Sequence, residues 1–360
     1  MVKLRVYALS TVLALSTLAL HAQYKSNYNY TTRAFQHMDF SVTAGSTGIG
    51  FDVATPVTDF LHVRAGFSFM PHFDYDVTFG IEAGRYDANG VWKATSQKQI
   101  QNYINQMKQL TGLTADTEVQ ATGNPSFYNA KLMFDFLPFR NKHWHLTAGF
   151  YFGPSKVATA VNKTEDMPTL IALTIYNQMY EKAVNGEPIL SYGEGDNAIS
   201  IYKPELANNG RMGFLLGYYN HDVYYTEDVY WTSFGFDENG PHEAGDVRYH
   251  AGDVKYHAGD PYMMEPDENS MARVAAYVNK FRPYLGFGYG GRLLKGNDDY
   301  HISFDCGAMF WGGTPDLIAH DGTNLTKDVR NVSGKVGTYV DLVKTFKVFP
   351  VLNLRITRRF

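Results

Sequence analysis

The chain has 360 residues, a formal net charge of −4 and a mean hydropathy of −0.29. The weakly acidic balance disfavours nucleic-acid binding as the main task, and no segment after the N-terminus is long and apolar enough for a membrane-spanning helix. The single Cys306 excludes an internal disulfide.

The N-terminus has the pattern of a secretory signal peptide. Lys3 and Arg5 precede a short apolar run, and Ala22 offers a small-residue cleavage point. The apolar run is shorter than the roughly 20 residues that a spanning helix requires. We therefore interpret residues 1–22 as a signal peptide for export across the inner membrane and residues 23–360 as one mature domain.

Further along, segments of alternating apolar and polar residues have the period of a β-strand. They lie around residues 40–44, 49–53, 61–69, 128–136, 144–152, 285–289, 302–310 and 352–356. A soluble sandwich could alternate in the same way, but a closed barrel can also cross a membrane because its backbone satisfies its own hydrogen bonds. Aromatic residues make up 15% of the chain, which suits a barrel with an aromatic belt at each membrane interface. The sequence predicts an antiparallel up-and-down transmembrane β-barrel of about eight strands.

The connections between these strands differ in length. If Phe360 lies in the periplasm, three connections fall on the periplasmic side and the long connections fall outside. The periplasmic ones are short, at 56–60, 137–143 and 292–299, and the outer ones are long, at about 70–126, 153–282 and 312–347. Short inner turns and long outer loops are typical of outer-membrane barrels.

The long loops have predicted structure of their own. An apolar stripe from Ile100 to Leu110 predicts an amphipathic helix, and a second helix is expected from about Asp166 to Ala183, with Gly186 just beyond its end. Residues 328–346 are expected to form a third helix. Segments 211–219 and 223–236 look like strands, which either extend the barrel above the membrane or raise its strand number to ten.

One loop contains a seven-residue repeat. Ala244–His250 reads Ala-Gly-Asp-Val-Arg-Tyr-His, and Ala251–His257 repeats it with Lys in place of Arg. The weak candidates for metal ligands are His242, His250 and His257, since imidazole and carboxylate together suit zinc. Their spacing matches no established site, so a duplicated surface loop is the favoured interpretation and no cofactor is expected.

The polar face of the barrel strands carries charged residues that should point into the lumen. They are Asp52, Arg64, Lys131, Asp135, Asp305 and Arg355, and His62, His145 and His301 share the same face. Side chains fill the lumen of an eight-stranded barrel, so these charges are expected to pair as a polar plug. An ion pathway or a hydrolytic His/Asp pair is the alternative.

Several blocks resemble a known family. They are Asp135-Phe136-Leu137-Pro138-Phe139, the segment His145 to Phe152, the segment Pro283 to Gly290, and Phe349-Pro350-Val351-Leu352-Asn353-Leu354. Together they resemble small Gram-negative outer-membrane β-barrel proteins of poorly defined function. The last strand, which ends on Phe360, resembles the closing strand of outer-membrane barrels, whose terminal aromatic residue is read by the barrel-assembly machinery.

These observations lead to an expected function. We expect a porin-like outer-membrane barrel of a Gram-negative bacterium, in contact with outer-membrane lipid and the assembly machinery. Its role is expected to be non-enzymatic: surface binding, adhesion or envelope structure, with an unknown extracellular ligand recognised by the loops. A narrow channel or carrier for small solutes is the first alternative, and an outer-membrane hydrolase the second.

Overall fold

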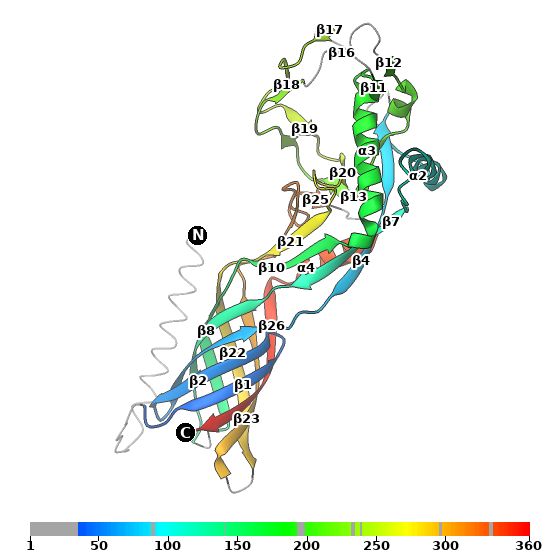
Figure 1. Cartoon of the computed structure of the whole chain (residues 1–360). Coiled ribbons are helices and arrows are strands. Elements are labelled where there is room, and N and C mark those ends of the chain that lie inside the picture. The colour runs from blue at the N-terminus through cyan, green and yellow to red at the C-terminus, as the bar shows by residue number, and fades with distance from the viewer. Residues whose placement is uncertain are drawn as a thin grey trace.

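Eight strands of the computed structural model close into an antiparallel barrel (Figure 1). The structure describes residues 35–87, 91–140, 142–192, 199–231, 235–237, 240–294, 297–330 and 334–360, so the expected signal peptide lies outside the described residues. The barrel strands, in order around the wall, are β1 (Asp39–Gly45), β2 (Gly48–Thr58), β3 (Leu61–Phe69), β8 (Tyr128–Phe136), β9 (Trp144–Phe152), β22 (Phe281–Leu294), β23 (Asn297–Phe310) and β26 (Val348–Arg359). Since β26 pairs with β1, the predicted barrel of eight strands is confirmed and the ten-stranded alternative is wrong.

The alternating pattern divides the barrel into two faces. On β1, Ser41 and Thr43 are buried in the lumen whereas Phe40 and Val42 are exposed outside. Each of the seven remaining barrel strands also exposes large apolar side chains on its outer face. Among them are Phe51, Phe67, Phe134, Leu146, Phe287, Phe304, Leu354 and Ile356. A contiguous apolar surface of this kind is what a strand barrel presents to lipid.

The two ends of the barrel differ. We call the end with the turns at 59–60 and 137–143 the turn end, and the opposite end the module end. The module end carries the three long connections and also one tight turn, from Gly45 to Gly48, so not every connection on that side is long. The hairpin of β22 and β23 extends beyond the other strands at the turn end (Figure 1).

The three long connections fold together into what we call the external module, comprising the described residues of 70–127, 153–280 and 311–347. Five adjacent barrel strands, β3, β8, β9, β22 and β23, continue into a five-stranded sheet with the same neighbour order. The strands of that sheet are β4 (Tyr75–Gly80), β7 (Glu118–Pro125), β10 (Lys156–Asn162), β21 (Arg273–Tyr277) and β24 (Asp316–Ala319). One side of the barrel wall therefore rises directly into the module (Figure 1).

A second sheet and three helices cover this wall extension. The sheet has the order β20 (Pro261–Met264), β13 (Arg211–Tyr219), β5 (Glu82–Tyr86), β6 (Trp92–Ala94), with β25 (Val329–Arg330) also pairing to β13. The helices are α2 (Gln97–Thr111), α3 (Met167–Val184) and α4 (Gly334–Thr345), with short 3-10 turns η1 (Thr164–Asp166) and η3 (Pro204–Asn208). The small remaining strands are β11 (Leu190–Tyr192), β12 (Ile199–Ile201), β14 (Val223–Tyr224), β15 (Val229–Tyr230), β16 (Gly235–Asp237), β17 (Gly240–His242), β18 (Val247–Tyr249) and β19 (Val254–Tyr256).

The module has an apolar core. Its buried members come from both sheets and all three helices, for example Val119, Ile100, Leu170, Phe214 and Val340. Since Val340 of α4 belongs to this core, the third helix packs in the module and not inside the lumen. Among the helices that the structure describes, none is both long and apolar enough to span a membrane.

Local sequence explains where α2 begins and ends. The Ser96 side chain accepts a hydrogen bond from the Gln99 backbone N–H, the Gln99 side chain accepts one from the Ser96 backbone N–H, and Gly112 closes the helix at φ 72°. This is a capping box followed by a left-handed C-cap, which only glycine adopts without cost. The predicted stripe is confirmed, because Ile100 and Ile104 are buried in the module core.

Two predictions for the loops need correction. The segment 223–236 is not one strand but the short strands β14, β15 and the start of β16, because its residues pair with a repeated segment that turns every seven residues. The helix expected over 328–346 begins only at Gly334, because Val329 and Arg330 instead form β25 beside β13. The helix expected over Asp166–Ala183 is confirmed as α3.

Candidate functional site

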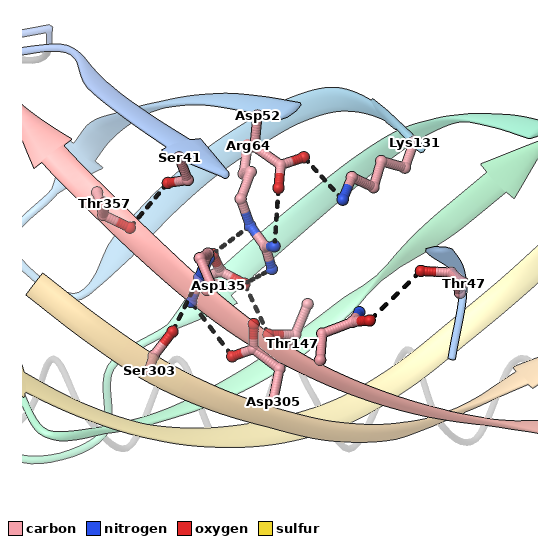
Figure 2. Close-up of polar contacts among 12 residues, drawn as sticks. Ser41, Thr47, Asp52, Arg64, Lys131, Asp135, Thr147, Ser303, Asp305 and Thr357 are labelled. Carbon is pink, nitrogen blue, oxygen red and sulfur yellow. Dashed lines mark hydrogen bonds and ion pairs between the residues drawn. The ribbon is translucent and has the colours of Figure 1, made fainter. Parts of the chain in front are cut away.

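The charged residues of the lumen form one connected chain, which we call the lumen network (Figure 2). It consists of Lys131, Asp52, Arg64, Asp135, Arg355, Asp305 and His145, in that order of contact. Lys131 Nζ lies 2.9 Å from Asp52 Oδ1, and Arg64 Nη1 lies 3.8 Å from Asp52 Oδ2. Arg64 also donates two hydrogen bonds to Asp135, from Nε at 3.0 Å and from Nη2 at 2.9 Å. Such a bidentate pair fixes the relative orientation of both side chains.

The chain of charges continues across the lumen to β23 and β26. Arg355 donates to Asp135 at 3.5 Å and to Asp305 at 3.3 Å, and Asp305 contacts His145 Nε2 at 2.7 Å. Cations and anions alternate along the network, with three of each when His145 is neutral. Since breaking a buried ion pair leaves an uncompensated charge, each member depends on its neighbours.

Hydroxyl groups complete the network. Thr147 Oγ1 donates to Asp135 at 2.6 Å, and Arg355 Nε donates to Ser303 Oγ at 2.9 Å. Ser41 and Thr357 share a hydrogen bond of 2.8 Å nearer the turn end (Figure 2). These contacts use acceptor and donor positions that the ion pairs leave open, which is the condition for burying charge in a narrow lumen.

Apolar side chains share the lumen with the network, and Met133 lies between Lys131 and Asp135 on β8. This apolar layer consists of Met133, Tyr151, Tyr284, Met309 and Val351, all buried. The Tyr151 and Tyr284 rings meet edge to face with centroids 5.6 Å apart.

Arg282 closes the module end of the lumen. Its side chain has 0% exposure, donates to the Asn279 carbonyl at 2.7 Å and also bonds to Asn129 and to the Pro154 carbonyl. Its guanidinium lies 5.1 Å from the centroid of the Phe127 ring. A single cation thereby ties β22 to β8 and to the segment after β9.

Glycines on the lumen face make room for the large side chains. A Cβ at Gly286 would lie 2.2 Å from Tyr284 Oη, and one at Gly288 would lie 2.3 Å from His145 Nε2. A Cβ at Gly66 would lie 2.0 Å from Asp52 Oδ1. The width of the lumen thus depends on which positions carry no side chain.

At the turn end the lumen opens into a cavity of about 700 Å³. Five histidines line it, namely His37, His62, His143, His145 and His301, together with Arg355, Arg359, Lys142, Asp39 and Asp135. His143 Nδ1 donates to the Gly290 carbonyl at 2.8 Å, and Arg359 pairs with Asp39 at 3.1 Å. The cavity ends at Asp135 and Arg355, so the lumen network forms its floor.

Comparisons with solved structures find distant similarity. No family model matches the chain, and neither does any curated protein sequence. CarO2 of Acinetobacter baumannii superposes with 11% identity and a TM-score of 0.34, covering 91% of this chain and 100% of that one. CarO of the same organism superposes with 10% identity and a TM-score of 0.32, and the match covers 90% of this chain and 97% of that one.

A third similar structure is a major outer membrane protein of Thermus thermophilus. It has 10% identity and a TM-score of 0.22, and the match covers 91% of this chain and 100% of that one. Because all three scores are below 0.5, these similarities carry no argument about role. The closed barrel, its apolar outer face and its charged lumen are what place the chain among β-barrels of the outer-membrane kind.

The structure brings all six predicted lumen residues into one network and adds His145 as its last member. His62 and His301 lie lower, at the wall of the turn-end cavity. Phe360 is 67% exposed at the turn end, and its backbone N–H donates to the Met38 carbonyl at 2.9 Å, which extends the seam between β26 and β1.

The weak metal candidates do not converge. His242 stacks on Trp231 with ring centroids 3.6 Å apart, whereas His250 and His257 lie beside different aspartates, Asp228 and Asp222. Within the described ranges, no group of three or more His, Cys, Asp or Glu side chains has the arrangement to hold a metal ion.

Sequence reasoning did not identify Arg282 or the two buried tyrosines of the apolar layer. Arg282 falls just before the segment expected to form a strand, although β22 begins at Phe281. A signal was present for Tyr284, because glycines at every second position, Gly286, Gly288 and Gly290, indicate a face where a large side chain from elsewhere must fit.

Proposed function

We propose that this protein is a non-enzymatic outer-membrane β-barrel of a Gram-negative bacterium that presents its external module for recognition at the cell surface. The barrel holds the module at the membrane, and the module carries the binding role. One observation supports this division above all. Five barrel strands run without change of neighbour order into a sheet with its own apolar core.

The filled lumen supports a mounting role over a conducting one. The lumen network and the apolar layer fill the lumen together, and Arg282 lies at its module end. A carrier or channel would require these side chains to move together. Since each charge of the lumen network has a partner of opposite sign, moving any one of them is costly.

The hydrolase alternative has less support from the geometry. The His145–Asp305 pair lies at the floor of the turn-end cavity, and Arg355 Nη2 lies 3.2 Å from the same imidazole nitrogen. A carboxylate only accepts, so the 2.7 Å contact makes His145 Nε2 the donor to Asp305 and leaves that nitrogen no lone pair for a substrate proton. The pair is therefore assigned to the network and not to catalysis.

The first experiment tests the orientation with introduced cysteines. Tyr192→Cys places a thiol at an 83% exposed position of the module, and Asp59→Cys places one in an exposed turn at the turn end. A membrane-impermeant maleimide should label the first variant on intact cells and the second only after the outer membrane is permeabilised. The unsubstituted protein, which carries only Cys306, measures the background. The opposite labelling pattern would overturn the proposal.

The second experiment tests whether the lumen of the barrel is closed to ions. The purified protein in a planar lipid bilayer should give no steady conductance, because the apolar layer and the network fill the lumen. A steady conductance that changes on Arg64→Ala would instead support the channel alternative.

Phe360 is proposed to serve the assembly machinery. It is the exposed end of the closing strand, and the Arg358 guanidinium lies 4.7 Å from the centroid of its ring. Phe360→Ala should lower the amount of folded protein in the outer membrane without altering the stability of the molecules that do fold. Unchanged amounts would argue against this role.

A further inference from the structure

The seven-residue repeat has a partner that is itself a repeat. Tyr219–Tyr224 reads Tyr-Asn-His-Asp-Val-Tyr and Tyr225–Tyr230 reads Tyr-Thr-Glu-Asp-Val-Tyr, a period of six. The two repeats run antiparallel, with β14 paired to β19 and β15 paired to β18. We call residues 219–260 the arm; its strands β18 and β19 lie at the side of the module away from α2 (Figure 1).

Each level of the arm, which we call a rung, is closed by the same hydrogen bonds. The glycine N–H of each seven-residue unit donates to the carbonyl of an aromatic residue: Gly259 to Tyr219 at 2.8 Å, Gly252 to Tyr225 at 2.8 Å, and Gly245 to Trp231 at 2.9 Å. These glycines have φ between 95° and 98°, which other residues rarely adopt. The repeated glycine is therefore required by the geometry of each rung.

The repeated aspartates hold the turns. Asp260 and Asp253 each accept the backbone N–H of the histidine three residues earlier, at 2.7 and 2.8 Å. On the opposite strand, Asp222 and Asp228 accept the N–H groups of Ala258 and Ala251, both at 2.7 Å. These four aspartates thus serve the backbone of the arm itself.

Inside the arm, aromatic pairs alternate with cations. Tyr219 stacks on Tyr256 at 4.9 Å, Tyr225 on Tyr249 at 4.7 Å and Trp231 on His242 at 3.6 Å. Lys255 Nζ lies 5.4 and 5.6 Å from the Tyr256 and Tyr225 rings, and the Arg248 guanidinium lies 4.2 and 5.3 Å from the Trp231 and Tyr249 rings. Burial raises the pKa of the Tyr225 and Tyr256 phenols, so both rings stay neutral. The stack stiffens the arm.

The surface of the arm repeats as a consequence. Tyr224 and Tyr230 occupy the same place in successive six-residue units, and each is 53% exposed. Tyr224 pairs across the strands with Val254, and Tyr230 with Val247. Two highly exposed histidines, His257 and His250, also recur at equivalent places, 3.9 Å from Asp222 and 3.7 Å from Asp228. A tyrosine, a valine, a histidine and an aspartate are thus presented twice.

We propose that the arm binds an uncharged polysaccharide, one stretch of sugar to each rung. This rests on the proposed surface location of the module. The same group of side chains occurs on successive rungs, so it suits a polymer that presents the same chemical unit repeatedly along its length. An exposed tyrosine ring offers an apolar face to sugar C–H groups, and the neighbouring imidazole and carboxylate offer hydrogen-bond partners for hydroxyls.

Charge and strand length disfavour the other occupants. Acidic residues outnumber Arg and Lys nine to two in residues 219–260, which opposes an anionic polymer or nucleic acid. Strand addition by a protein partner is opposed by strands of only two or three residues, since such short edges offer few backbone groups to pair with.

The test uses affinity electrophoresis of the purified full-length protein in gels containing dextran, a β-1,3-glucan, mannan or, as the charged comparator, dextran sulfate. Retardation by at least one neutral polymer is expected. Tyr224→Ala and Tyr230→Ala should each weaken binding about two- to tenfold, the range typical of one aromatic contact. The control is Tyr192→Ala, at a tyrosine of the module outside the arm that is 83% exposed, against 53% for Tyr224 and Tyr230; this variant should bind as the unsubstituted protein does.

A rung deletion provides the sharper test. Removing Tyr225–Tyr230 together with Ala244–His250 deletes one six-residue and one seven-residue unit. Trp231 then takes the place of Tyr225 opposite Gly252, and Glu243 takes the place of His250 beside Asp253, so the bonds of the rung can form again. Affinity for the long polymer should fall at least about tenfold because one of two linked contacts is lost, whereas affinity for a short oligosaccharide that covers one rung should not change. If the deletion variant does not fold, the double substitution of Tyr224 and Tyr230 by alanine replaces it.

The outcomes separate this inference from the proposed function. Retardation by dextran sulfate alone, by no polymer, or equally in the tyrosine variants overturns the polysaccharide site. If Tyr192→Cys is nevertheless labelled on intact cells, the surface location still holds. If that labelling fails, the proposed function fails as well.

Discussion

The barrel and the external module bury opposite kinds of side chain, although each barrel strand concerned leads directly into a strand of the module. In β7 the inward residues are apolar: Val119 belongs to the core of the module and Ala121 is buried as well. Only a few residues later, in β8, the inward residues are Asn129 and Lys131, which lie in the lumen. The face that turns toward the protein interior changes from apolar to polar because the surroundings change from water to lipid.

The two interiors should also fail in different ways. The lumen depends on directional ion pairs, so removing one charge leaves others unpaired. The module core depends on burial of apolar volume, so removing atoms leaves a cavity. Substitutions in one region should therefore leave the other intact, and the following predictions test this comparison.

The largest effect is expected for Asp135→Ala in the lumen network. Asp135 is the carboxylate shared by Arg64 and Arg355, so its removal leaves two guanidinium groups without their common partner. The free energy of unfolding of the barrel should fall by about 3–5 kcal/mol. Urea titration in lipid vesicles, followed by heat-modifiable gel migration, measures it. The matched control Asp59→Ala, in an exposed turn, should change nothing; equal stability of both variants would contradict a structural network.

Phe214→Ala is expected to lower the free energy of unfolding by a comparable amount, but only in the module. Phe214 is buried in the module core, where its ring meets that of Phe79 at 5.9 Å. Truncation should cost the module about 3–5 kcal/mol. Limited proteolysis of the module should become faster while heat-modifiable migration of the barrel stays the same. Simultaneous loss of both would show that the two regions unfold as one unit.

A smaller effect is expected for Leu354→Arg on the outer face of β26. Leu354 is 47% exposed midway along a barrel strand. An arginine facing the bilayer midplane costs about 2–4 kcal/mol, whereas the same residue facing water costs little. Unfolding in lipid vesicles should show the loss, and Tyr192→Arg in the module serves as the control. A fully stable Leu354→Arg variant would contradict a lipid-facing outer surface.

The smallest effect is expected for Gly286→Ala. The added Cβ would lie 2.2 Å from Tyr284 Oη and 2.8 Å from the Cys306 carbonyl oxygen, so side chain and backbone must both shift. Overpacking of this kind costs about 1–3 kcal/mol. Gly80→Ala, where a Cβ meets no atom within 4 Å, is the matched control in the module. Equal unfolding curves for the two variants would show that the apolar layer has room to adjust.

The sequence by itself determined the barrel. Alternation on segments such as Phe40–Ala44 and Leu352–Ile356 was enough to predict eight strands and which charges enter the lumen, because a strand with lipid on one side and a filled lumen on the other must alternate throughout. The helix that includes Ile100 could also be predicted from the sequence, because its apolar residues lie on one side and pack against the module core. In these elements local pattern and final environment agree.

Only the tertiary structure decided how the module is built. The order of its five-stranded sheet follows from the barrel wall beneath it, and Val329 joins a strand because β13 offers a free edge beside it. Likewise, the seven-residue repeat acquires meaning only once its six-residue partner lies opposite. Neither repeat indicates by itself which segment it will lie against, because pairing depends on where the chain returns and not on what it contains locally.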